Sequence, residues 1–362
     1  MKTDNATVHE GLEGIVVTTT QIGMVDGDKG ELIVRGVPME KLAPTNTYES
    51  IAELLWPQAF QREPAQLLFA KAREDAWARR LETGGAFGLQ NGMDALRASL
   101  AHLKGTGDNV DAVALAGSAC VFVAAWSRTL RGLSPIAPDA ALTQSEDFLR
   151  MMSGVRKGPE LARGLDTYWV TVCDHGMNAS TFTARVVAST EADMVSAIVA
   201  AVGALKGPLH GGAPGPVLDM LDAIGAPEHA EAWIEGALMR GERIMGMGHR
   251  IYRVRDPRAE VLERAIETLT RSGVESQRLS LARAVESVAK GALQKKYPSR
   301  SLNANVEFYT AVLLDALGLP KEVFSPTFAI GRILGWAAHV MEQRTKKRLI
   351  RPESRYAPHP VG

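Results

Sequence analysis

The sequence has few cysteines and no net charge, and each of these absences excludes a class of protein. Only two of the 362 residues are cysteines, Cys120 and Cys173, and both lie in apolar surroundings. A disulfide framework is therefore excluded, and two buried thiols in a reducing compartment are expected. Basic and acidic residues balance at 41 each. A neutral chain has no overall field that would recruit nucleic acid or an acidic membrane.

Long apolar runs are also missing. The longest uncharged stretch, residues 112–127, is too short to span a bilayer and contains glycine and serine, so it predicts a buried helix. The first ten residues lack the apolar core of a signal peptide. We therefore expect a cytoplasmic protein with neither a membrane nor a nucleic-acid partner.

Several motifs of known chemistry are absent as well. No Gly-x-Gly-x-x-Gly follows a predicted strand, and there is no Walker loop and no Gly-x-Ser-x-Gly elbow. His175, His210 and His249 are far apart and lack the short spacings of zinc ligands, so we expect no metal site.

Most of the sequence has the hydrophobic spacing of α-helices. Hydrophobic residues make up 46% and charged residues 23%, which is typical of a soluble globular protein, and the length suggests two domains. After Thr47, apolar residues recur at spacings of three and four, which predicts helices almost throughout. Before it, a β-branched run at 15–20, a turn at Asp26–Gly30 and an alternating segment at 31–35 predict a small β-hairpin.

Three helix starts are well marked. Thr190 and Asp193 form a capping-box pattern that predicts a helix over 191–205. This helix is apolar nearly all round and is therefore expected in a core or between subunits. Asp256-Pro257 and Ser325-Pro326 each pair an N-cap residue with proline at the first helical position, which predicts two further helices.

Two histidines stand in glycine-flanked loops. His210 lies in Pro-Leu-His-Gly-Gly and His249 in Gly-Met-Gly-His-Arg. Glycines let the backbone approach a ligand closely, and histidine moves protons near neutral pH. A single histidine is more often structural, but the pair favours a functional site. His175, beside Asp174 at a helix end, is a weaker candidate on pattern alone. The remaining five histidines lack such a context.

Arg258, Arg332 and Arg351 could each be a solvated residue or a salt-bridge partner. Together with the histidines they would suit a small polycarboxylate, because guanidinium binds carboxylate in a bidentate manner.

Eight motifs follow one another along the chain. They are Gly11-Leu-Glu-Gly-Ile, Asp26-Gly-Asp-Lys-Gly-Glu-Leu, Asp174-His-Gly-Met-Asn-Ala-Ser-Thr-Phe-Thr-Ala-Arg185, Gly203-Ala-Leu-Lys-Gly-Pro-Leu-His-Gly-Gly212, Met245-Gly-Met-Gly-His-Arg-Ile-Tyr252, Asp256-Pro-Arg, Asn305-Val-Glu-Phe-Tyr309 and Phe328-Ala-Ile-Gly-Arg332. With these motifs in this order, the sequence resembles the citrate synthase family from about Gly11 to Pro352.

The resemblance implies an almost all-α, two-domain fold with a small N-terminal β-hairpin, assembled as a homodimer with shared active sites. The large domain would comprise residues 1–212 and 313–362, and a small CoA-binding domain, residues 213–312, would close over the substrate. The residues implied to hold oxaloacetate are His175, His249, Arg258 and Arg332, with Arg351 reaching in from the partner subunit. Basic candidates for CoA contacts, which could equally form a solvated face, are Lys295, Lys296 and Arg300.

The implied reaction is that of a citrate synthase, an acyltransferase. Glu307 would remove a methyl proton from acetyl-CoA, and His210 would donate a hydrogen bond to the enolate oxygen. His249 would polarise the oxaloacetate carbonyl, and the citryl-CoA formed would be hydrolysed to citrate and CoA. Acetyl-CoA is a co-substrate here, and no tightly bound cofactor is expected.

The chain departs from the family pattern at three places. Glu307 stands where an aspartate is usual, Gly176 replaces a glutamate, and Pro214-Gly215 replaces Asn-Glu. These differences suggest a divergent branch and leave two alternatives open: a 2-methylcitrate synthase that uses propionyl-CoA, and a catalytically weak homologue that binds CoA and oxaloacetate. The first motif also lies close to the start of the sequence. We therefore expect the short, dimeric type without an N-terminal regulatory domain and without the NADH inhibition of larger relatives.

Overall fold

A computed structural model describes residues 7–210, 214–249, 251–274 and 277–356. The strands are β1 (Gly23–Asp26), β2 (Glu31–Val34) and β3 (Val37–Pro38). The helices are α1 (Met39–Leu42), α2 (Tyr48–Leu55), α3 (Ala65–Ala78), α4 (Gly92–Leu100), α5 (Asp108–Leu130), α6 (Gln144–Ser153), α7 (Pro159–Val172), α8 (Ala179–Ser189), α9 (Met194–Leu205), α10 (Pro214–Ile224), α11 (Ala230–Met239), α12 (Pro257–Arg271), α13 (Gln277–Lys296), α14 (Val306–Ala316) and α15 (Phe324–Thr345). Short 3-10 helices occur at Pro57–Phe60, Arg80–Gly88, Pro227–His229 and Lys321–Val323.

The predicted hairpin is confirmed, and a third short strand extends it into an antiparallel sheet of order β1-β2-β3. Asp26 Oδ1 accepts hydrogen bonds from the main-chain N–H groups of Asp28 and Lys29, and Gly30 has a φ of +70° that closes the turn. The first strand begins at Gly23, after the β-branched run at 15–20, so that run is not part of the sheet.

The core is built around two long buried helices, α5 and α15. By length and composition α5 could cross a membrane, but 89% of its apolar window is buried inside the protein, as expected for residues 112–127. Helix α3 crosses α5 closely because Gly117 has no side chain: a Cβ there would lie 2.6 Å from the Cβ of Ala72. Cys120 and Cys173 are buried free thiols, as predicted.

Two of the three predicted helix starts need correction. Helix α12 does begin at Pro257 with Asp256 as its N-cap, so that prediction is confirmed. The predicted capping box at Thr190 is wrong. Glu191 has a φ of +67°, which is not helical, so α9 begins later, with Asp193 as its N-cap. Helix α15 begins at Phe324, since the preceding 3-10 turn leads directly into it and its proline is tolerated in the first turn.

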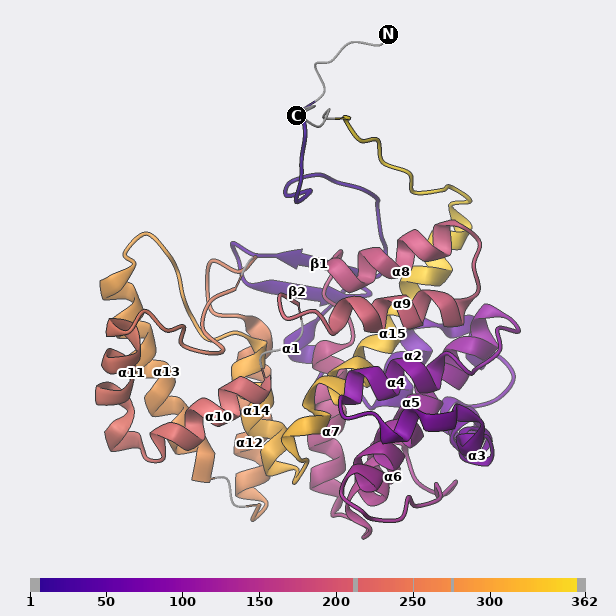
Figure 1. Ribbon diagram of the computed structural model, residues 1–362, viewed down its shortest axis with the longest axis horizontal. Helices are drawn as coiled ribbons and strands as arrows, with labels where there is room; N and C mark the ends of the chain where they lie inside the picture. Colours follow the sequence, from indigo (N-terminus) through magenta and orange to yellow (C-terminus); the bar gives the residue numbers. More distant parts are fainter. Residues whose placement is uncertain (1–6, 211–213, 250, 275–276, 357–362) are drawn as a thin grey trace, which may run out of the picture.

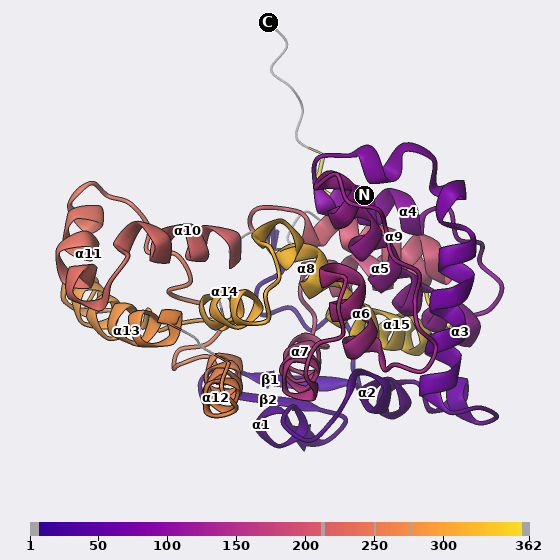
Figure 2. The same ribbon diagram turned by 90° about the horizontal axis from the view of Figure 1, so that it is seen from below.

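The helices form a larger body and a group on one side. Helices α10, α11, α13 and α14 lie together at one side of the molecule in both views (Figures 1 and 2). Helix α12 packs against α14 and α7. The predicted border at 212–213 lies outside the described residues, and the predicted border at 312–313 falls inside α14. The division into domains at these residues stays a prediction.

Two carboxylates are buried together where α2, α6 and α7 meet. Asp166 accepts the main-chain N–H of Tyr48 at 3.0 Å, and Glu49 accepts that of Gln144 at 2.7 Å. Burial, with a further contribution from the Glu49 charge, raises the pKa of Asp166 to about 8. Asp166 is therefore protonated in the folded protein at neutral pH.

Replacing Asp166 by asparagine should remove a pH dependence of stability. An unfolded aspartate loses its proton near pH 4, whereas folded Asp166 keeps it to about 8. The free energy of unfolding of the original protein should therefore fall as pH rises between these values, by up to about 1.4 kcal/mol per unit. Asp166→Asn should lack this slope in urea titrations at pH 5, 6.5 and 8. Parallel curves for the two proteins would contradict the prediction.

Candidate active site

His210 lies in the turn after α9 and contacts the start of α8. Its Nε2 lies 3.2 Å from the main-chain N of Ser180 and 2.7 Å from the Ser180 Oγ. A main-chain N–H can only donate, so Nε2 is the acceptor and a neutral ring carries its proton on Nδ1. Burial, and then the charge of Arg332, lowers the pKa of His210 to about 4. His210 is thus a neutral donor, suited to an oxygen that becomes negative during a reaction.

His249 has the opposite tautomer. Its Nδ1 accepts the main-chain N–H groups of Ile251 at 3.0 Å and Tyr252 at 3.1 Å, so the ring proton is on Nε2. Burial, and then Arg258, lowers the pKa of His249 to about 4. The Nε2 lies 3.3 Å from Arg258 Nη2, which is also a donor. Two donors that converge in this way fit an oxygen acceptor of a bound molecule.

Arg258 is held by the carboxylate of Asp256. Asp256 Oδ1 accepts the main-chain N–H and the Nε of Arg258, each at 3.0 Å, and Oδ2 accepts its Nη2 at 2.7 Å. Oδ2 also accepts the main-chain N–H of Val306 at 3.1 Å. The Asp256 carboxylate therefore joins the loop of His249 to the first residue of α14.

Glu307, the second residue of α14, follows directly. Burial raises its pKa to about 7, although the charge of Arg258 opposes the shift. A carboxylate with a pKa near the working pH is suited to act as a general base. The glycines before His249 let its loop pack on α14: a Cβ at Gly246 would lie 2.9 Å from the Phe308 side chain, and Asn305 Nδ2 donates to the Gly248 carbonyl at 2.9 Å.

His175 lies opposite His249, with ring centroids 5.4 Å apart in an edge-to-face arrangement. Burial, followed by the charges of Arg258 and Arg332, holds the pKa of His175 well below its usual value, so the ring is neutral. Arg332, on α15, donates from Nε to the Val172 carbonyl at 2.6 Å. Its pKa is lowered by burial to about 10, which leaves it positive at neutral pH.

A buried hydrogen-bond chain supports the segment that carries His175. The neighbouring Asp174 accepts from His339 Nε2 at 3.0 Å, and Arg185 Nη1 contacts His339 Nδ1 at 2.8 Å. An arginine can only donate, so His339 Nδ1 accepts and its proton points to Asp174. His339 is structural, as expected from its sequence context, but it steadies a residue beside the site.

The structure thus gathers most of the predicted site residues and leaves others apart. The gathered set is His175, His210, His249, Arg258, Glu307 and Arg332. Arg351 is exposed in the segment after α15, which projects from the helical body (Figure 1). Lys295, Lys296 and Arg300 are exposed at the end of α13, with the Tyr297 ring 5.6 Å from Lys296 Nζ and 5.9 Å from the Arg300 guanidinium.

Residues that the sequence did not single out for the site include Ser180, Tyr252 and the partners of Asp174. Tyr252 stands inside the His-Arg-Ile-Tyr motif, and that position was the one available signal. Within the described ranges, no group of three histidine, cysteine or acidic side chains is arranged to hold a metal ion.

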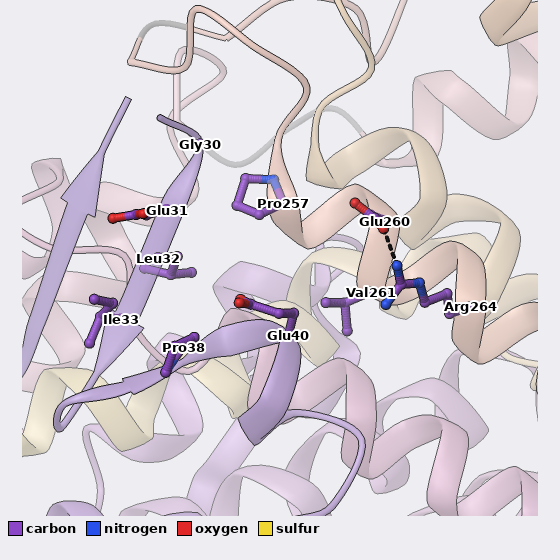
Figure 3. Close-up of a pocket in the computed structure, with 10 residues that line it drawn as sticks. All are labelled: Gly30, Glu31, Leu32, Ile33, Pro38, Glu40, Pro257, Glu260, Val261 and Arg264. Atoms are coloured by element: carbon purple, nitrogen blue, oxygen red, sulfur yellow. Dashed lines mark hydrogen bonds and ion pairs between the residues drawn. The ribbon is translucent and has the colours of Figure 1, made fainter. Parts of the chain in front are cut away.

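A cavity of about 340 Å³ lies elsewhere, between the sheet, α1 and α12 (Figure 3). Its polar lining consists of Glu31, Glu40 and the ion pair of Glu260 with Arg264. It reaches Pro257, next to Arg258, but none of the gathered site residues lines it.

Asp256→Asn should destabilise the protein strongly, because it leaves the guanidinium of Arg258 buried without its counter-charge. Arg258 is 3% exposed and Asp256 1%. Breaking such a buried pair costs about 3–5 kcal/mol, although asparagine can still cap α12. Urea unfolding measures the loss. Asp219→Asn removes the exposed ion pair with Lys321 and should change stability little, so equal effects of the two substitutions would contradict the prediction.

Comparison with known proteins identifies the family of this chain. The family model for the citrate synthase C-terminal domain matches residues 11–353. A citrate synthase of Deinococcus radiodurans is 34% identical over 96% of this chain and 95% of its own length. A 2-methylcitrate synthase of Mycobacterium tuberculosis is 35% identical over 97% of this chain and 91% of its own.

Solved structures have the same fold. The crystal structure of citrate synthase from Thermotoga maritima superposes with a TM-score of 0.84 at 34% identity, covering 98% of both chains. The citrate synthase of Thermoplasma acidophilum, in a ternary complex with carboxymethyl coenzyme A and oxaloacetate, gives a TM-score of 0.86 at 25% identity over 98% of this chain and 97% of its own. The expected all-α fold is confirmed, and the chain belongs to the citrate synthase family of condensing enzymes.

Proposed function

We propose that this protein condenses acetyl-CoA with oxaloacetate and releases citrate and CoA. One observation carries the proposal: His210 and His249 are two neutral imidazoles in opposite tautomers, each oriented by main-chain N–H groups, beside a carboxylate with a pKa of about 7. Such a set can donate hydrogen bonds to two oxygens and remove one proton without a metal ion.

The 2-oxo acid would bind among His175, His249, Arg258 and Arg332. The two guanidinium groups supply positive charge for carboxylates, and neutral imidazoles supply further donors. An oxygen atom of the acid, from its carbonyl or a carboxylate, could accept hydrogen bonds from both His249 Nε2 and Arg258 Nη2. The related enzyme from Thermoplasma acidophilum was crystallised with oxaloacetate, which supports this assignment.

The acyl-CoA half of the reaction would use Glu307 and His210. Glu307 takes a proton from the thioester methyl group, while the Nδ1–H of His210 stabilises the enolate oxygen. The enolate carbon then bonds to the oxo carbon, and His249 Nε2–H stabilises the new alkoxide, which takes that Nε2 proton to become a hydroxyl. Water finally cleaves the thioester. Removing one hydrogen-bond donor to a developing oxyanion typically lowers kcat by about 10²–10³-fold.

One face of α9 supports assembly as a dimer. Val199, Ala200, Gly203 and Ala204 on this helix are only half-buried, and a second subunit would cover them. In such a dimer Arg351 would complete the site of the partner subunit. The segment 213–312 would carry CoA, with Lys295, Lys296 and Arg300 near its phosphates, and would close over the substrates in the cytoplasm.

A second candidate, 2-methylcitrate synthase, is favoured by the relative of that name. One methylene in an apolar pocket is worth about 1–3 kcal/mol, so propionyl-CoA could compete with acetyl-CoA. A third candidate, a weak homologue that only binds its ligands, remains because of the departures at Glu307, Gly176 and Pro214.

Glu307→Gln should slow turnover severely. The purified protein with oxaloacetate and acetyl-CoA should release free thiol, and the variant should be slower by roughly 10²–10⁴-fold because the base is lost. An unchanged rate in a folded variant would show that another group removes the proton. No release by the original protein, with oxaloacetate still bound, would favour the weak homologue.

The pH dependence of kcat/KM should report the same base. Only ionised Glu307 accepts a proton, and its pKa is about 7, so kcat/KM should rise with pH through about 7 and level off above it. Glu307→Asp is the matched variant, since it keeps a carboxylate but changes its reach and burial. It should retain measurable activity with a shifted midpoint. A flat profile in the original protein would contradict the assignment.

The ratio of kcat/KM for acetyl-CoA to that for propionyl-CoA should exceed one if the protein is a citrate synthase. Both are measured by thiol release at saturating oxaloacetate. A ratio below one would assign the protein as a 2-methylcitrate synthase.

A further inference from the structure

Tyr252 touches three of the residues proposed to bind the 2-oxo acid. Its hydroxyl lies 3.1 Å from His175 Nε2, and its main-chain N–H donates to His249 Nδ1. Its ring centroid is 5.5 Å from that of His175 and 4.7 Å from that of His249. The guanidinium carbon of Arg258 lies 5.8 Å from the same ring. Among the residues described above, only Tyr252 lies against His175, His249 and Arg258 together.

The hydroxyl of Tyr252 determines which nitrogen of His175 is free. The side chain is buried, with 1% of its surface exposed, and burial raises the pKa of the phenol, so it keeps its proton. A buried O–H without an acceptor is costly, and His175 Nε2 is the acceptor at hydrogen-bond distance. Because His175 is neutral, its own proton is then on Nδ1, where it can be donated to a ligand.

The N-terminal sheet holds Tyr252 in place. The residues on both sides of it contact the turn of the hairpin: Arg253 N–H donates to the Gly27 carbonyl at 2.8 Å, and a Cβ on Gly27 would lie 2.4 Å from the Ile251 carbonyl oxygen. The close approach therefore depends on glycine at position 27. The hairpin, far from the histidines in sequence, thus fixes the loop that orients two of them.

We propose that Tyr252 is a positioning residue for the 2-oxo acid, whose hydroxyl holds His175 in the tautomer that donates from Nδ1 to a substrate carboxylate. This inference rests on the proposed function, because it assumes that His175 binds the oxo acid. It assigns to Tyr252 a role in affinity for one substrate, whereas a purely structural tyrosine would affect both substrates alike.

Tyr252→Phe tests the proposal because it removes only the hydroxyl and keeps the ring. The KM for oxaloacetate should rise roughly tenfold, the loss expected for one buried hydrogen bond that orients a binding group. The KM for acyl-CoA and kcat at saturating oxaloacetate should change less than about twofold. Equal rises in both KM values, or an unchanged KM for oxaloacetate, would overturn the proposal.

Tyr48→Phe is the matched control. It also removes one buried tyrosine hydroxyl, which donates to the Ile330 carbonyl at 3.0 Å, but it lies outside the site. Thermal unfolding of both variants checks that they fold. Tyr48→Phe should leave both KM values unchanged, so a rise in the oxaloacetate KM equal to that of Tyr252→Phe would mean that any lost core hydroxyl produces the effect.

A double-mutant cycle shows whether Tyr252 acts through His175. In a His175→Gln background, Tyr252→Phe should cause little further loss of oxaloacetate affinity. Fully additive losses would overturn the proposal. Calorimetric titration of oxaloacetate into the original protein and Tyr252→Phe separates this inference from the proposed function. Weaker binding by the variant supports the positioning role even if no acyl-CoA is turned over, and equal binding overturns it even if turnover occurs.

Discussion

The carboxylate of Asp256 is the group on which the rest of the site depends. It accepts four hydrogen bonds, three from Arg258 and one from the main chain of Val306, while almost completely excluded from water. Because a buried guanidinium needs a counter-charge, this contact holds Arg258 beside His249. Because the same carboxylate binds the start of α14, it also sets where Glu307 stands. One residue therefore couples Arg258, proposed to bind the oxo acid, to Glu307, the proposed base.

Burial among positive charges explains the chemistry of the histidines. His175, His210 and His249 all have lowered pKa values, with burial as the main cause and arginine charge as the second. A charged imidazole would be a stronger donor, but two arginines and several protonated histidines in one site would repel one another. Neutral imidazoles oriented by backbone N–H groups avoid this repulsion and still offer a directed proton. The same burial raises the pKa of Glu307, the proposed base, to about 7.

The small sheet supports the site although none of the proposed site residues lies in its strands. Its turn packs on residues 251–253, and this packing connects the hairpin with the loop of His249. Helix α15 contributes from the other end of the chain, through Arg332 and through Trp336, whose Nε1 donates to Ser180 Oγ at 3.1 Å. The site is thus assembled from segments throughout the sequence.

Local signals in the sequence determined the helical class, the hairpin turn and the start of α12, because periodicity, turn residues and the Asp256-Pro257 cap act over a few neighbouring residues. The ordered motifs determined the family and six of the proposed site residues. The start of α9 was missed, because a single residue with positive φ, Glu191, outweighed a favourable capping pattern.

Only the tertiary structure decided the protonation and the partners of those residues. The tautomers of His210 and His249 depend on main-chain N–H groups that face them, and the pKa of Glu307 depends on how much water burial removes. The position of Tyr252 between two histidines also depends on long-range packing. Such effects arise from distances and solvent exclusion between segments that are remote in sequence, and no local pattern encodes them.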